Sequence, residues 1–186
     1  YSGDKQLSSK KHYLGGNVKA GLNYNLDDYN NVLFNTGFIS RAPIFDNTFI
    51  NSQSSHERNP DAKNEKVYSF ELGYGYRSQY FSANVNAYYT MWKDKDLYDT
   101  GSYEDVNGAS QRWTMNMTGA QANHMGIELD FIAKPFRWME VNGMFSWGDW
   151  RWNGTAKGFM MNTEGQIMAN SRGEVVTDMS NVDQYK

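Results

Sequence analysis

A repeated alternation of apolar and polar residues, with a period of two, is the feature that most limits how this chain can fold. In the segment 12–27 one set of alternate positions holds Val18, Ala20, Leu22, Tyr24 and Leu26, and the other holds Asn17, Lys19, Gly21, Asn23 and Asn25. Successive side chains of a β-strand point to opposite faces, whereas a helix would scatter these residues around its axis. The pattern therefore predicts a strand with one apolar face and one polar face.

The same alternation recurs along most of the chain and predicts about six strands. We place them at residues 12–27, 31–41, 65–77, 80–92, 114–133 and 139–149. Short turns at 27–30, 77–80 and 134–138 alternate with long connections at 42–64, 93–111 and from 149 onward. Such alternation indicates antiparallel up-and-down strands that have all their tight turns at one end.

Aromatic residues, which make up 16% of the 186 residues, cluster near the predicted strand ends. Tyr29, Tyr80, Phe136 and Trp138 lie beside the short turns, and Trp92, Trp113, Trp147 and Trp150 lie beside the long connections. Amphipathic rings form such belts at lipid headgroups. Outer-membrane barrels have short periplasmic turns and longer extracellular loops. We therefore predict an all-β fold of antiparallel up-and-down strands that form part of a transmembrane β-barrel, not closed within this chain.

Two other kinds of β-protein remain possible on the pattern alone. A soluble barrel or sandwich also alternates, with its apolar face turned inward, and could bind carbohydrate through exposed aromatic rings. An outer-membrane adhesin would share the barrel without transporting anything. The loop asymmetry, the paired aromatic ends and the small polar residues of the second face favour the membrane over the soluble alternative. No run approaches 18 apolar residues, so a transmembrane helix is not expected.

Three longer strings resemble the later barrel strands of TonB-dependent outer-membrane receptors, in particular those of the Bacteroidetes type. They are NTGFISRAPIFDNTF (35–49), NEKVYSFELGYGYRSQYFSANVNAYYTMWKDK (64–95) and HMGIELDFIAKPFRWMEVNGMFSWGDWRW (124–152). The resemblance runs from about residue 13 to about residue 152, and it is the order and spacing of the strings together that make it specific. It implies a place in the C-terminal part of such a barrel.

The resemblance also implies a function and a set of partners. Such receptors bind a scarce or bulky nutrient outside the cell and import it to the periplasm with energy delivered through TonB. Their barrels have about 22 strands and enclose a plug, so we expect residues 1–186 to be a partial barrel from which the plug domain is absent. The expected location is the bacterial outer membrane, and the expected partners are its lipid, the plug, the TonB complex and a surface lipoprotein. The ligand would be a small molecule, metal chelate, glycan or peptide.

The sequence holds no set of residues that suggests an enzyme, a metal centre or a cofactor. His12, His56 and His124 are far apart and lack metal-binding spacing, and the chain has no cysteine. Asp94, Asp96, Asp99, Glu104 and Asp105 lack the glycine and the final glutamate of an EF-hand loop. The net charge of −3 does not suggest nucleic-acid binding.

Two groups of residues are candidates for function. Charged residues on the polar face would point into the lumen and could meet a plug: Lys19, Arg41, Glu71, Arg77, Glu128 and Asp130. We expect Glu71 and Glu128 in particular to help hold a basic plug surface. Aromatic residues and a histidine in the long connections could contact ligand: Phe45, Phe49, His56, Tyr98, Tyr103 and Trp113. Exposed rings of this kind stack on sugars and on planar chelators.

Overall fold

The chain forms a single antiparallel β-sheet in a computed structural model that describes residues 10–49, 58–104, 108–154, 156–162 and 178–179. The strands are β1 (Gly16–Asn25), β2 (Asn30–Arg41), β3 (Glu65–Arg77), β4 (Phe81–Glu104), β5 (Ser110–Phe136), β6 (Met139–Asn153), β7 (Ala156–Asn162) and β8 (Asp178–Met179). A short 3-10 helix, η1 (Phe45–Thr48), follows β2. Among the described residues there is no helix that is long and apolar enough to cross a bilayer.

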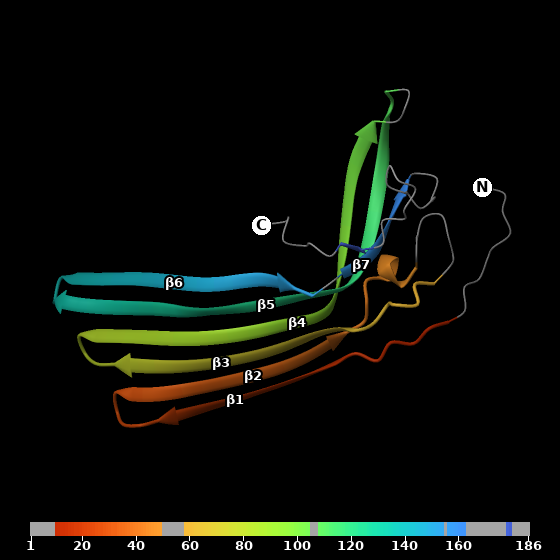
Figure 1. The fold of residues 1–186 in the computed structure, drawn as a ribbon. Coiled ribbons are helices and arrows are strands. Elements are labelled where there is room, and N and C mark those ends of the chain that lie inside the picture. The colour runs from red at the N-terminus through yellow and green to blue at the C-terminus, as the bar shows by residue number, and fades with distance from the viewer. Residues whose placement is uncertain (1–9, 50–57, 105–107, 155, 163–177, 180–186) are drawn as a thin grey trace.

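The strands follow one another in space as they do in sequence (Figure 1). β1 to β5 pair in order, every pairing is antiparallel, and β6 pairs with the free edge of β5. No pairing among the described residues joins β1 to the opposite edge, so the sheet is open. The predicted all-β, up-and-down, unclosed arrangement is confirmed, and it is consistent with part of a barrel.

The register of the strands sorts the side chains onto two faces. Residues directly opposite each other in neighbouring strands share a face. One such row on the apolar face is Leu22, Phe34, Leu72, Ala87, Ile127 and Trp147. One residue further along, a row on the polar face is Asn23, Leu33, Gly73, Asn86, Glu128 and Ser146.

The apolar face is not covered by any other part of the described chain. Leu22 is 65% exposed, Leu72 56% and Phe145 62%. Large apolar side chains that remain exposed in a continuous band across several strands mark a surface that meets lipid or another protein. Within the part of the chain that the structure describes, this band is therefore a surface and not the cover of a core.

Tight turns close one end of the sheet. In the turn between β1 and β2 the carboxylate of Asp27 accepts the backbone N–H of Tyr29 and of Asn30, both at 2.8 Å. The bond from Tyr29, followed by one from the side-chain amide of Asn30, lowers the pKa of Asp27 from its usual range because both bonds stabilise the charged form. The side chain thus holds a four-residue turn that needs no glycine.

Two of the predicted long connections are strands instead. The loop predicted at 93–111 is largely absent, because β4 continues to Glu104 and β5 already starts at Ser110. The predicted loop from residue 149 onward is also wrong at its start. β6 continues to Asn153, and β7 then extends the same edge of β5. Alternation did not predict these extensions because it is interrupted where the strands change register.

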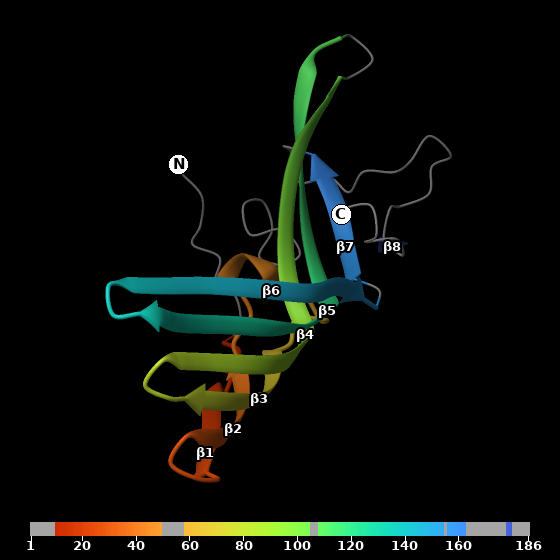
Figure 2. The ribbon, with the colours of Figure 1, turned by 90° about the vertical axis from the view of Figure 1, so that its left-hand side faces the viewer.

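The strands bend sharply where those interruptions fall. The β4–β5 pairing shifts register between Trp92 and Leu97, and Asp94 has a positive φ of 53°. On the other edge of β5, Gln121 pairs with Asn153 and Thr118 pairs with Lys157. The chain advances by four residues from Asn153 to Lys157 but by only three between Gln121 and Thr118, so one extra residue forms a bulge. Bulges bend a strand and increase its twist. Figures 1 and 2 show β4, β5 and β7 turning away from the main sheet at this level.

A small packed core lies at this bend, on the extended part of the sheet. Met115, Met117, Ala120 and Ala156 are buried there, with Leu97, Trp113 and Trp152 packed around them. Helix η1 is tied to the core through Asn47, which is buried and whose side-chain amide donates to the carbonyl oxygen of Met117 at 3.2 Å. The connection between β2 and β3 is thereby anchored on the extension.

Candidate functional site

The six charged residues predicted for the polar face do lie on one face of the sheet, but they are spread along its length. Arg77 pairs with Ser82 near the tight turns, and Arg41 pairs with Glu65 at the other end. Between them the side-chain amide of Asn35 donates to Glu71 at 3.0 Å, and that of Asn84 donates to Asp130 at 2.9 Å. In register, Lys19 lies opposite Gly37 and Glu128 opposite both Asn86 and Ser146. The structure does not bring these six residues together into one site.

Four aromatic side chains form a cluster on the same polar face, near the bend. We call Tyr88, Trp92, His124 and Trp150 the aromatic platform. The indole Nε1–H of Trp150 donates to the hydroxyl of Tyr88 at 3.0 Å. The ring of His124 lies between Trp92, 6.4 Å away, and Trp150, 6.3 Å away, measured between centroids. The platform therefore crosses β4, β5 and β6.

Two glycines make room for the platform. Tyr88, Gly126 and Gly148 lie opposite one another in register. A Cβ atom on Gly126 would lie 2.6 Å from the Tyr88 hydroxyl, and one on Gly148 would lie 3.0 Å from Nε1 of Trp150. Since glycine has no side chain, the tips of both rings can lie close against the backbone of the sheet.

The platform presents aromatic ring surface that suits stacking contacts. Trp150 remains 65% exposed although its only polar atom already has a partner. Such a ring offers an apolar face whose orientation is held before anything binds, which lowers the entropy lost on binding. Sugar rings and planar aromatic groups bind such surfaces. No group of three or more acidic or histidine side chains in the described residues could hold a metal ion.

A charged cluster links the platform to the connection between β2 and β3. Glu65 is only 3% exposed and accepts from both Arg41 and Lys95, the latter at 3.3 Å. The ammonium group of Lys95 also lies 4.2 Å from the centroid of the Trp92 ring, a cation–π contact. Glu65, the first residue of β3, thus joins the end of β2 to the bend of β4 beside the platform.

Asp96 anchors the same connection to the extended part of β4. One of its carboxylate oxygens accepts the backbone N–H of Ile44 at 3.1 Å. Burial raises the pKa of Asp96 because it penalises the charged form, and the bond from Ile44 opposes that effect. The start of the connection, including η1, is therefore held against the bend by both Asp96 and Asn47.

Comparison with known proteins identifies the family of this sheet. The family described as TonB dependent receptor-like, beta-barrel matches residues 2–182. The chain belongs to this family. Comparisons with curated proteins and with solved structures give no match. In outer-membrane barrels the outward face is apolar and the inward face is polar. On that pattern the aromatic platform lies on the inner side of the barrel wall.

The predicted aromatic belt beside the long connections needs correction. Of its four tryptophans, Trp147 lies on the apolar face of the barrel wall, in the row with Leu72. Trp92 and Trp150 lie on the polar face and belong to the platform, and Trp113 packs against the core at the bend. The alternation itself already separated these tryptophans, because the even-numbered positions of β4 and β6, among them Trp92 and Trp150, fall on the polar face.

The loop aromatics predicted for ligand contact are not assembled into one site. Phe45 and Phe49 form an edge-to-face pair with centroids 5.3 Å apart, and Phe45 is exposed. Trp113 pairs with Gly101 and so shares its face of the β4–β5 ribbon. Tyr98 lies three positions before Gly101 on β4, an odd number, so Tyr98 is on the opposite face from Trp113. His56 and the side chain of Tyr103 lie outside the described residues.

Proposed function

We propose that this chain forms wall of an outer-membrane receptor that binds a scarce or bulky nutrient outside the cell and imports it to the periplasm with energy from TonB. The observation that carries the proposal is the continuous apolar face, exposed on every strand from β1 to β6 and opposite a polar face. Membership of the TonB-dependent receptor family supports the same conclusion. The transport cycle needs binding and gating, and it makes or breaks no bond in the nutrient.

The proposal gives each end of the sheet a side of the membrane. The tight turns would lie in the periplasm, and the bent extension of β4, β5 and β7 would project from the outer surface. The polar face would meet a plug supplied elsewhere in the receptor, with Glu71 and Glu128 among its contacts. A surface lipoprotein is a further partner in this proposal, as are a Bacteroidetes origin and a place late in the barrel.

The aromatic platform suggests which part of the wall touches the nutrient. It lies on the inner face next to the bend, where a ligand entering from outside would first meet the barrel wall. Exposed aromatic rings favour a ligand that has an apolar surface of its own, such as a glycan or a planar chelate. Phe45 and Phe49, in the connection between β2 and β3, and Tyr98, on the extension, would contact the ligand earlier along its path.

Cell fractionation combined with uptake measurements tests the proposal. We expect the intact receptor to be extracted from the outer membrane only by detergent, and its nutrient to accumulate only in cells with an active TonB complex. A receptor that is freely soluble after lysis would contradict the membrane location and favour a soluble β-domain. A membrane-bound receptor that supports no energy-dependent uptake would contradict transport and favour an adhesin.

A further inference from the structure

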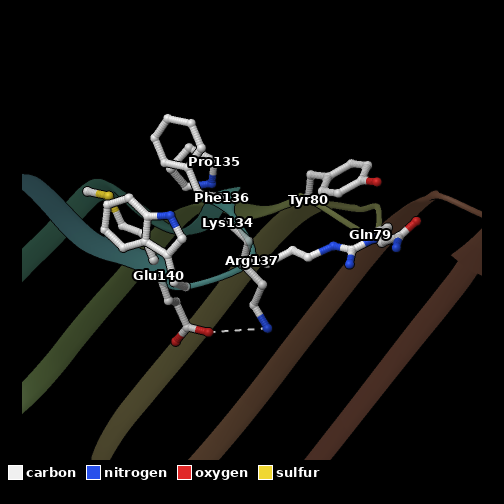
Figure 3. A pocket seen from close by; sticks show the side chains of 9 residues that line it. Gln79, Tyr80, Lys134, Pro135, Phe136, Arg137 and Glu140 are labelled. Atoms are coloured by element: carbon white, nitrogen blue, oxygen red, sulfur yellow. Dashed lines mark ion pairs between the residues drawn. The ribbon is translucent and has the colours of Figure 1, made fainter.

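A hollow of about 660 Å³ lies between two neighbouring tight turns, the β3–β4 turn and the β5–β6 turn. The first turn contributes Gln79 and Tyr80, and the second contributes the segment 134–140. Figure 3 shows the two turns side by side, with the side chains that line the hollow drawn as sticks. The hollow is at the opposite end of the sheet from the aromatic platform, so the proposed ligand site does not account for it.

One side of the hollow is aromatic and continues the apolar face. The rings of Phe136 and Trp138 are stacked in parallel, with centroids 5.4 Å apart and planes 3° apart. Trp138 is 81% exposed, and Tyr80, across the hollow, is exposed as well. The next residues toward the middle of the sheet on this side include Phe81 and Val141, which lie in one row of the apolar face. Acyl chains that cover that face would therefore run directly up to these rings.

The hollow also carries a net positive charge. Lys134 is paired with Glu140 at 3.2 Å, which neutralises both groups. Arg137 has no ion-pair partner among the residues that the structure describes, and Figure 3 shows its side chain extending from its own turn in the direction of Gln79. Two cations and one anion leave a formal charge of +1. Arginine presents planar donors that suit a phosphate group.

We infer that this hollow binds the headgroup of an anionic phospholipid, with the phosphodiester on Arg137 and the acyl chains along the apolar face beside Phe136 and Trp138. The inference rests on the proposed membrane location of the chain. Amphipathic rings favour the depth of lipid headgroups, and a basic residue at that depth attracts anionic lipid. The single unpaired positive charge matches the single negative charge of a phosphatidylglycerol headgroup.

A periplasmic protein or the plug would use only the cations of the hollow. Such an occupant would not account for the parallel rings of Phe136 and Trp138, which lie on the same side of the sheet as the apolar face. A lipid uses both halves of the hollow at once, because its phosphate and its chains are covalently joined. The geometry therefore favours lipid over a protein partner or a free anion.

Native mass spectrometry of the intact, delipidated receptor tests the inference. The receptor would be titrated with phosphatidylglycerol, with phosphatidylcholine of the same acyl chains and with inorganic phosphate. We expect phosphatidylglycerol to bind in preference to both. Arg137→Gln should weaken this binding about fivefold, the effect of one basic residue near an anionic surface. Arg137→Lys should retain most of the binding.

Arg112→Gln is the matched control, because Arg112 is an exposed arginine at the far end of β5. Equal binding of the two lipids, full binding by Arg137→Gln, or equally strong binding of inorganic phosphate would overturn the inference. An equal loss in Arg112→Gln would overturn it too.

Retention of the heat-modifiable gel mobility of a folded barrel shows that Arg137→Gln has folded. Normal uptake without any lipid preference would contradict only this inference, whereas a receptor that is soluble after lysis would contradict the proposed function as well.

Discussion

Replacement of Leu72 by arginine is expected to destabilise the folded barrel by about 2–4 kcal/mol, the cost of a cation on the lipid face near the middle of the bilayer. Leu72 lies in the central row of the apolar face, and more than half of its side chain is exposed. The arginine side chain would be forced into hydrocarbon or would have to distort the bilayer to reach water. The effect should be visible as a lower free energy of unfolding in lipid vesicles and as less receptor in the outer membrane.

Leu33→Arg is the matched control for this substitution. Leu33 is also a leucine and lies on the adjacent strand, at the next position along the sheet, but it belongs to the polar face opposite Gly73. There the arginine would meet the lumen, so we expect a loss of well under half that of Leu72→Arg. Equal losses from the two substitutions would contradict the assignment of the faces.

Replacement of Trp150 by alanine is expected to weaken nutrient binding by about thirtyfold or more, which corresponds to the ~2 kcal/mol typical of a tryptophan at the centre of a binding surface. The substitution removes the most exposed ring of the platform and leaves the hydroxyl of Tyr88 without its donor. The quantity to measure is the dissociation constant of the nutrient identified by uptake, with intact receptor in detergent.

Trp147→Ala provides the control on the same strand. Trp147 is similarly exposed but lies on the apolar face, so its removal should leave nutrient affinity unchanged. Tyr88→Phe should cause a smaller loss than Trp150→Ala, because it frees the indole from its hydrogen bond but keeps both rings. Unchanged affinity in Trp150→Ala, or an equal loss in Trp147→Ala, would show that the platform does not contact the nutrient.

The two faces of the sheet could be predicted from sequence because alternation is a local property of each strand. Leu22 and Asn23 point to opposite faces in any extended strand, whatever surrounds it. The bent extension could not be predicted in the same way. Its strands are interrupted at Asp94 and near Gly154, where bulges shift the alternation, and its packing depends on partners such as Asn47 that lie elsewhere in the sequence.

Only part of the platform could be predicted from the sequence. The alternation places Tyr88 and Trp92 on the polar face of β4, but the contact of His124 with Trp150 depends on the register between β5 and β6. The cluster around Glu65 has the same origin, since Lys95 follows Glu65 by 30 residues. Register is decided by the whole sheet, so no single strand reveals which side chains will meet across it.

Spin labelling of adjacent positions on β6 tests most directly the claim that one face of this sheet meets lipid. The chain has no cysteine, so Phe145→Cys and Ser146→Cys each introduce one labelling site into it. With the intact receptor in bilayers, a nitroxide at position 145 should collide often with oxygen dissolved in the lipid and rarely with a water-soluble nickel chelate. A nitroxide at position 146 should show a clearly lower collision rate with oxygen. Equal oxygen collision rates at the two positions, or a label at 145 that neither reagent reaches, would contradict a lipid-facing barrel wall.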